Sequence, residues 1–147
     1  MIKINCGCGR YPLAGFVNLD KKKGWVAQDG LKDFEDFSIS GITISHMLIY
    51  LSHRETYDFF KECYRVLGQG GIIRITEDNT TSPESEIFGG WRDFITLTDP
   101  KIMIILLEKA GFTARECAPD ETLFIDKSLI QQFHGSPPRV FHVEGAK

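Results

Sequence analysis

Two glycines and an aspartate near the start of the sequence are the first residues whose types and spacing could bind a ligand. The stretch from Ile4 to Asp20 reads INCGCGRYPLAGFVNLD, with Gly7 and Gly9 directly after an apolar run. Because glycine has no Cβ atom, a loop built on these residues can turn sharply and lie close to a ligand. An aspartate at the end of a following strand can accept hydrogen bonds from both hydroxyls of a ribose. Asp20 is therefore a candidate ribose ligand, with a turn-capping aspartate as the alternative.

The distance from the glycines to Asp20 is too short for the usual dinucleotide site. Asp20 follows Gly9 by eleven positions, and Pro12 and Gly15 interrupt any helix between them. A dinucleotide site uses a third glycine and an acidic residue about 20 positions further on. The spacing therefore disfavours a nicotinamide-dependent reductase, and it predicts strands at 2–6 and 16–19 that are joined without a normal helix.

His46 is the candidate general base. It lies in an apolar segment, 39–51, that alternates at first and then reads as a strand covered on both faces. The ligand crevice of an open α/β sheet lies at the carboxyl ends of its strands, so a titratable group there is well placed to accept a proton. Tyr50 and His53 follow on the chain. A histidine that only packs in the core is the alternative interpretation.

Capping residues predict the helices that position these groups. Ser52 with Glu55 three positions on forms a capping box, and apolar residues recur at helical spacing until Gly68. A second helix begins after Asp99, with proline at its first position, and ends at Gly111. Residues 24–37 read as a loop with at most one helical turn, in which Asp29 and Gly30 either contact a ligand or simply reverse the chain.

Strands that alternate with helices predict a single α/β domain over residues 1–147. Further strands are expected at 72–76, 113–118, 121–126 and 140–144, and a long loop of the kind that often carries function is expected at 79–97. The order favours a mostly parallel sheet with an antiparallel edge near the C-terminus. The chain of 147 residues is long enough for one domain with a core, and its 42% hydrophobic residues are ordinary for a globular protein.

Composition also limits the partners and the compartment. The net charge of -3 argues against a nucleic-acid partner. No apolar run approaches the roughly 18 residues of a membrane span, and the sequence begins with a strand-like segment rather than a signal peptide, so we expect a cytoplasmic protein. The four cysteines, Cys6, Cys8, Cys63 and Cys117, include no second close pair. They predict reduced core thiols and no metal centre.

Three motifs occur in a characteristic order: INCGCG leading to GFVNLD at 4–20, SHML at 45–48, and YRVLGQGGIIR at 64–74. Together they resemble small Rossmann-like (class I, methyltransferase type 11-like) methyltransferases that depend on S-adenosylmethionine (SAM) and read "NLGCG…P…GFVNVD", "SHVLEHL" and "YRVLKPGG". The resemblance covers residues 2 to about 78 well and the C-terminal part more loosely. It implies a class I fold with a reduced first helix, SAM as cofactor, and transfer of a methyl group to a small-molecule or sugar-type acceptor.

The resemblance also implies which residues contact the cofactor. The glycine loop would lie against the methionine part, Asp29 would face the adenine amine, and Leu31 would lie against the ring. The implied set is Asn5, Cys6, Gly7, Cys8, Gly9, Asp20, Asp29, Gly30, Leu31, His46, Met47 and Leu48.

The sequence departs from this pattern in places. Asn5 stands where many members have an acidic residue, and Ile49 and Tyr50 stand where Glu and His are common. These departures favour an alternative function, a catalytically inactive SAM-binding module that acts with a protein partner or as a homodimer. Arg74 interrupts a buried strand and therefore needs a carboxylate partner or a ligand. Glu77 and Asp78, at the end of that strand, could supply the partner or could contact a substrate.

Overall fold

The computed structural model describes residues 1–82, 96–121 and 139–147. Its strands are β1 (Ile2–Cys6), β2 (Val17–Leu19), β3 (Ile39–Ser45), β4 (Leu67–Asp78), β5 (Thr113–Glu116) and β6 (Val140–Ala146). Its helices are α1 (His53–Val66) and α2 (Pro100–Ala110), with short 3-10 turns η1 (Lys21–Lys23), η2 (Ala27–Asp29) and η3 (Leu48–Tyr50). The strand predicted at 121–126 and most of the loop predicted at 79–97 lie outside the described residues.

The strands form one six-stranded sheet in the order β2-β1-β3-β4-β6-β5. The pairs β1–β2, β1–β3 and β3–β4 are parallel, whereas β6 runs antiparallel to both β4 and β5. The predicted antiparallel edge is therefore present, with β6 inserted antiparallel between β4 and the edge strand β5. β1 and β2 are joined without a helix, as the spacing of the glycines, Pro12 and Asp20 predicts. The α/β class with a reduced first helix is confirmed.

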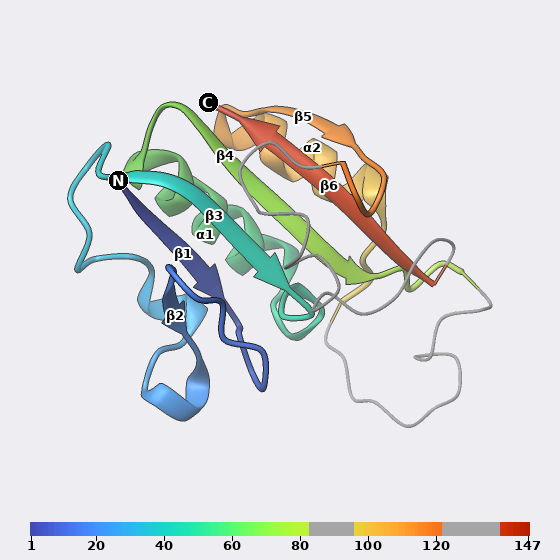
Figure 1. Ribbon diagram of the computed structural model, residues 1–147. Coiled ribbons are helices and arrows are strands. Elements are labelled where there is room, and N and C mark those ends of the chain that lie inside the picture. Colours follow the sequence, from blue (N-terminus) through green and yellow to red (C-terminus); the bar gives the residue numbers. More distant parts are fainter. Residues whose placement is uncertain (83–95, 122–138) are drawn as a thin grey trace.

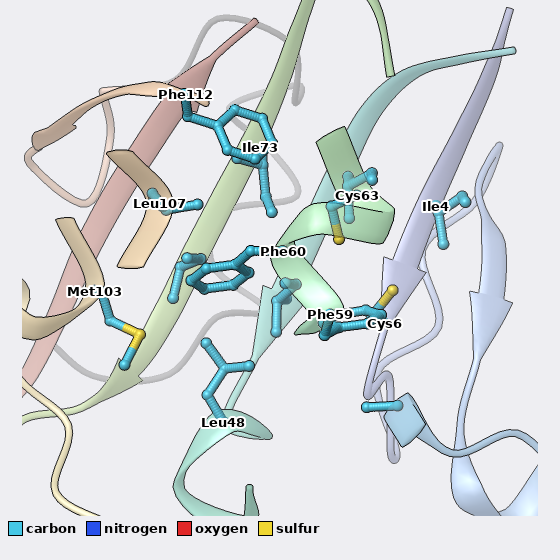
Figure 2. Close-up of a cluster of buried hydrophobic side chains, with 14 of the residues drawn as sticks. Ile4, Cys6, Leu48, Phe59, Phe60, Cys63, Ile73, Met103, Leu107 and Phe112 are labelled. Carbon is cyan, nitrogen blue, oxygen red and sulfur yellow. The ribbon is translucent and has the colours of Figure 1, made fainter. Parts of the chain in front are cut away.

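The two faces of the sheet differ in polarity. Figure 1 shows α1 and α2 together behind the sheet, and their apolar side chains join those of the strands in one core. Figure 2 shows this cluster, which includes Cys6, Phe59, Phe60, Cys63, Ile73, Met103 and Leu107. Because side chains alternate along a strand, the neighbouring positions point to the opposite face. Those positions form a row of polar residues in register, namely Asn5, Thr43, Arg74 and Glu144.

Both predicted helix starts are confirmed. The Ser52 side chain accepts a hydrogen bond from the Glu55 backbone N–H, and the Asp99 side chain accepts one from that of Ile102. Gly111 ends α2 in the left-handed conformation, with φ of 113°. In the described part of the chain, no helix combines the length and the apolar character that crossing a membrane requires.

The predicted end of α1 at Gly68 is wrong. The helix ends at Val66 and passes directly into β4, whose first residue, Leu67, is extended. The Nζ of Lys147 donates to the carbonyl oxygens of Tyr64 and Leu67, at 2.6 and 2.7 Å. A lysine from the far end of the chain therefore satisfies carbonyl groups that a helix end leaves without partners.

The strand predicted at 39–51 is also shorter than expected. β3 ends at Ser45, His46 takes a left-handed conformation with φ of 49°, and η3 follows. The apolar run continues past the strand because Leu48 and Ile49 are buried within the turn. His46 therefore lies at the carboxyl end of a central strand, as predicted.

Candidate functional site

The carboxyl ends of β1, β2, β3 and β4 lie along the same edge of the sheet because these strands are parallel (Figure 1). Four chain segments follow directly at this edge: the Gly7–Gly9 loop, Asp20, the turn from His46 to Leu48, and the Glu77–Asp78 pair at the end of β4. Ligands of open α/β sheets bind at this edge.

Asp20 is tied directly to the glycine loop. Its Oδ2 accepts a hydrogen bond from the Gly9 backbone N–H at 3.0 Å, and its Oδ1 accepts one from that of Lys22, also at 3.0 Å. Asp20 thus caps η1, which is the alternative role that the sequence allowed. The Asp20 carboxylate retains hydrogen-bonding capacity after capping, because each of its oxygens can accept a further hydrogen bond.

The glycines of the loop differ in what surrounds them. Both have positive φ, 71° for Gly7 and 48° for Gly9. A Cβ atom on Gly7 would lie 3.0 Å from the Cβ of Met47, whereas one on Gly9 would meet no atom within 4 Å. Packing against Met47 therefore explains Gly7, and the space beside Gly9 is open to a ligand.

Asn5 and Asn18 hold the loop that replaces the first helix. The Asn5 side-chain amide donates to the Tyr11 carbonyl at 3.2 Å and to Asn18 Oδ1 at 2.9 Å. Asn18 in turn donates to the carbonyls of Leu13 and Phe16 and accepts from the Leu13 N–H. These amides satisfy backbone groups that a helix would have satisfied internally. Sequence reasoning missed Asn18; a polar side chain in so short a strand was the available signal.

The turn that contains Asp29, Gly30 and Leu31 rests on α1. The Leu31 N–H donates to Glu62 Oε2 at 3.3 Å, and the Arg65 guanidinium donates to the Leu31 carbonyl at 3.1 Å. Hydrogen bonding to Arg65 lowers the pKa of Glu62 below its ordinary value. Leu31 as a whole is only 1% exposed, and its backbone N–H and carbonyl are both paired with side chains of α1. Asp29 is exposed.

A cleft of about 250 Å³ lies between this turn and α1, and Ala27, Gln28, Asp29, Gly30, Glu55, Asp58, Phe59 and Glu62 line it. It contains the predicted Asp29 and Gly30, but none of the glycine loop. Trp25 connects the two regions, because its backbone N–H donates to the Asp20 carbonyl and its ring N–H donates to the Gly30 carbonyl. The structure thus joins Gly7, Gly9, Asp20 and Met47 by direct contact. The 29–31 turn is linked to this group through Trp25.

Of the remaining predicted cofactor residues, two have buried side chains that point away from the edge. The Cys6 side chain lies in the core against α1 (Figure 2), and that of Leu48 is fully buried. Both residues are 0% exposed with their backbones included, and the Leu48 N–H is already donated to Glu77. Cys8 is buried beside Gly9, and all four cysteines are free thiols, as predicted.

His46 faces two carboxylates from the end of β4. Its Nδ1 lies 3.3 Å from Asp78 Oδ2 and 3.9 Å from Glu77 Oε1. The His46 side chain is 27% exposed, whereas those of Glu77 and Asp78 are 0% and 6% exposed. Sequence reasoning considered both carboxylates as partners of Arg74 or as substrate contacts, and not as partners of His46. One ligand atom from each of the three side chains lies within 4.8 Å of the other two. The absence of a metal centre stays a prediction.

Glu77 fixes the turn that carries His46. Its Oε2 accepts a hydrogen bond from the Leu48 N–H at 2.7 Å, and its Oε1 accepts one from the Asp78 N–H at 3.1 Å. A left-handed non-glycine residue costs on the order of 1–3 kcal/mol and persists only where its surroundings enforce it. The buried carboxylate of Glu77 supplies that enforcement for His46.

Burial raises the pKa of Glu77 to about 7, from an ordinary 4.5, against the lowering effects of His46 and of the backbone hydrogen bonds. The folded state therefore binds more protons than the unfolded state between these pH values, and Glu77 lowers stability as pH rises through that window. We expect the free energy of unfolding of the parent to fall by on the order of 2–3 kcal/mol across this pH window. In Glu77→Gln the free energy of unfolding should change less with pH. Urea unfolding at pH 5, 6, 7 and 8 measures both.

The control for this prediction is Glu108→Gln, which changes an exposed glutamate on α2. The free energy of unfolding of Glu108→Gln should change with pH in the same way as that of the parent. If the profile of Glu77→Gln also runs parallel to that of the parent, Glu77 is not the group that titrates in this range.

Arg74 has a structural partner that the sequence did not single out. It is fully buried, and its Nη1 lies 3.1 Å from Glu144 Oε1 on the neighbouring strand β6. Its guanidinium also donates to the carbonyls of Pro119 and Glu121, each at 2.7 Å. Arg74 therefore anchors the segment after β5 on the face of the sheet opposite α1 and α2.

Comparison with known proteins finds similarity at the level of structure. No protein-family model matches the chain, and no curated protein matches it. A SAM-dependent methyltransferase from Archaeoglobus fulgidus has a TM-score of 0.70 at 16% identity, and the match covers 99% of this chain and 85% of that one. One from Methanosarcina mazei has a TM-score of 0.61 at 12% identity, with 99% and 91% covered.

A third solved structure is a complex from Haloferax volcanii between the Trm112 methyltransferase activator and a protein assigned as a methyltransferase. Its TM-score is 0.67 at 11% identity, with 99% of this chain and 81% of that chain covered. At these identities the likeness concerns the fold. With its glycine loop, its sheet order and the inserted antiparallel β6, this chain has the fold of the class I, Rossmann-like SAM-dependent methyltransferases.

Proposed function

We propose that this protein transfers a methyl group from SAM to a small-molecule or sugar-type acceptor. The main support is the hydrogen bond between the Gly9 N–H and the Asp20 carboxylate at the carboxyl edge of the sheet. The space beside Gly9 is open. A fold alone does not define a function, because one fold hosts many activities. The arrangement at this edge is what a nucleoside ligand with a ribose would need.

The residues present fit SAM. Asp20 retains hydrogen-bonding capacity for ribose hydroxyls, and the space beside Gly9 admits a ligand against the backbone. Asn5 Oδ1 is buried at the end of β1 and has no hydrogen-bond partner, so it is an acceptor suited to the amino group of the methionine part. The Gly30 backbone and Asp29 are the candidates for the adenine end. When bound, SAM supplies an electrophilic methyl group on its sulfonium.

The contribution of the protein to the reaction is mainly positioning. The rigid sheet edge places the ligand loop on β1 and the His46 turn on β3 next to each other. His46, which is partly exposed and faces Asp78, is the residue that would accept a proton from the methyl acceptor.

Asp20→Asn tests the ribose contact. Replacing the carboxylate by an amide should weaken SAM binding by about 1.5–3 kcal/mol, the usual contribution of hydrogen bonds to a charged group. Calorimetry gives the dissociation constant, and thermal unfolding reports any loss of the loop itself. Asp33→Asn, at an exposed position with no hydrogen bond among the described residues, is the matched control. Equal dissociation constants for both variants would leave Asp20 as a capping residue only.

A second candidate is a SAM-binding module without activity of its own. The amide of Asn5 is committed to the loop and brings no negative charge to the site. The Haloferax volcanii complex also shows that a protein with this fold can be bound to an activator. Transfer of a labelled methyl group from SAM to a pool of small metabolites decides between the two. Transfer by the isolated chain supports the enzyme, and transfer only after a partner protein is added supports the module.

A further inference from the structure

Trp25 lies between the Asp20 carboxylate and the cleft beside the 29–31 turn, and it contacts the chain on both sides. We propose that Trp25 is a positioning residue that fixes this cleft relative to Asp20, so that the base and the ribose of one nucleoside are bound together. The proposal rests on the proposed function, because it takes SAM as the nucleoside ligand. Trp25 acts through Asp20 and Gly30 and touches no reacting atom.

Trp25 makes one hydrogen bond toward each region. Its backbone N–H donates to the Asp20 carbonyl at 3.2 Å, and its indole Nε1–H donates to the Gly30 carbonyl at 3.0 Å. The backbone hydrogen bonds of this segment, such as those from Lys23 to Asp20 and from Gly30 to Ala27, each close a single turn. Short 3-10 turns of this kind have poor hydrogen-bond geometry and do not fix a spacing across the whole segment. The side chain of Trp25 therefore supplies the longer connection.

The residue that accepts the indole hydrogen bond has an unusual backbone. Gly30 has φ of 66° and ψ of -156°, a combination that is essentially restricted to glycine. A Cβ atom at this position would also lie 3.2 Å from Glu62 Cγ. This conformation presents the Gly30 carbonyl to Trp25, which precedes it by five positions.

The cleft itself has a separate support. The backbone N–H and carbonyl of Leu31 are both paired with side chains of α1, so that helix holds the turn. Phe59, which lines the cleft, packs against the indole ring with the ring centroids 5.8 Å apart. Loss of the indole N–H alone therefore leaves the cleft on α1 and releases only its position relative to Asp20.

A ligand that occupies both regions gains from their fixed spacing. The second half of a linked ligand binds at an effective concentration that depends on how well the two regions are held in position. Adenine alone uses only the cleft, whereas adenosine also uses the Asp20 carboxylate. The hydrogen bond from Trp25 to Gly30 should therefore raise the affinity for adenosine and leave the affinity for adenine unchanged.

Titrations of the parent and of Trp25→Phe with adenine and with adenosine test this proposal. Phenylalanine keeps an aromatic ring against Phe59 but has no N–H to donate. We expect the dissociation constant of adenine to stay the same and that of adenosine to rise by about tenfold, the scale of one hydrogen bond. NMR titration measures both constants, including weak ones. Equal losses of affinity for the two ligands, or no loss for either, overturn the proposal.

Tyr64→Phe is the matched control, because it also removes one polar group from an aromatic ring that packs on the core. Tyr64 lies on α1 against Phe112, with ring centroids 5.1 Å apart, and it does not line the cleft. Both dissociation constants should equal those of the parent. A tenfold loss of adenosine affinity in this control as well would assign the effect to general packing and overturn the role of Trp25.

Exchange of the indole proton in the parent decides the question if Trp25→Phe does not fold. A ligand that binds only while the hydrogen bond from Trp25 to Gly30 is closed slows the exchange of that proton with solvent. Adenosine should slow the exchange, and adenine should not. Equal slowing by both ligands, or slowing by neither, overturns the proposal.

SAM, titrated into the parent and Trp25→Phe, separates failure of this proposal from failure of the proposed function. We expect SAM to lose affinity by the same factor as adenosine. If the parent binds adenosine but not SAM, the proposed function fails, and the constants for adenine and adenosine still decide the role of Trp25. If the parent does not bind adenosine at all, the role of Trp25 is overturned.

Discussion

Arg74→Met should lower the free energy of unfolding by about 3–5 kcal/mol, the cost of breaking a buried ion pair by removing one partner. Arg74 is fully buried and Glu144 is 3% exposed. The substitution leaves the Glu144 carboxylate buried without its cation, and it removes the donor from the carbonyls of Pro119 and Glu121. Glu144 Oε2 already has no hydrogen-bond partner, so the carboxylate has little other support. Urea unfolding at pH 7 measures the change.

Arg115→Met is the matched control for this prediction. Arg115 also pairs with a carboxylate, that of Glu121 at 3.0 Å, but its side chain is 53% exposed. Exposed pairs contribute little to stability, so this variant should unfold close to the parent. The double variant Arg74→Met/Glu144→Leu should recover part of the loss, because it removes both charges. Equal effects of Arg74→Met and Arg115→Met would mean that the polar row on the face opposite α1 and α2 does not stabilise the fold.

Gly9→Val should weaken SAM binding by roughly 10- to 100-fold, the equivalent of about 1.4–2.8 kcal/mol. A Cβ atom at this position meets no heavy atom within 4 Å, so the added side chain would occupy the space where we expect the ligand to lie. The side chain also strains a backbone with φ of 48°, which can shift the N–H that Asp20 accepts. Calorimetric titration of the folded variant with SAM measures the loss.

Gly15→Val separates the ligand contact from the backbone strain. Gly15 also has positive φ, 81°, and open space beside it. It precedes the amino end of β2, whereas Asp20 follows the carboxyl end of that strand. Both variants should lose stability to a similar extent, and only Gly9→Val should lose affinity for SAM. If Gly9→Val binds SAM like Gly15→Val, the glycine is needed for the turn alone.

The fold was predictable from the sequence wherever local chemistry determines structure. The capping residues Ser52 and Asp99 and the terminal Gly111 act on their own helices, and the short path from Gly9 to Asp20 leaves no room for a helix. The side chain that caps the end of α1 was not predictable, because Lys147 reaches carbonyl groups about eighty positions earlier in the chain. Nor was the end of β3, since an apolar run does not distinguish a strand from a buried turn.

The same distinction holds for the candidate site. Asp20, Gly9 and His46 follow strand ends, so their common edge could be inferred from a parallel sheet. Their supports could not be inferred. Glu62 and Arg65 reach the 29–31 turn from α1, and Glu77 holds Leu48 from 29 positions away. The partner of Arg74 lies 70 positions along the chain on a strand that inserts antiparallel beside β4. Such pairings depend on strand order, which periodicity does not specify.

Calorimetric titration of the parent protein with SAM, with its demethylated product and with NAD is the sharpest test of SAM binding. We expect saturable binding of SAM and of the product at a single site, with no binding of NAD. We also expect a melting temperature that rises with the logarithm of the excess of SAM over its dissociation constant. No heat and no thermal shift with SAM or its product at millimolar concentration, or equal binding of NAD, would contradict this expectation.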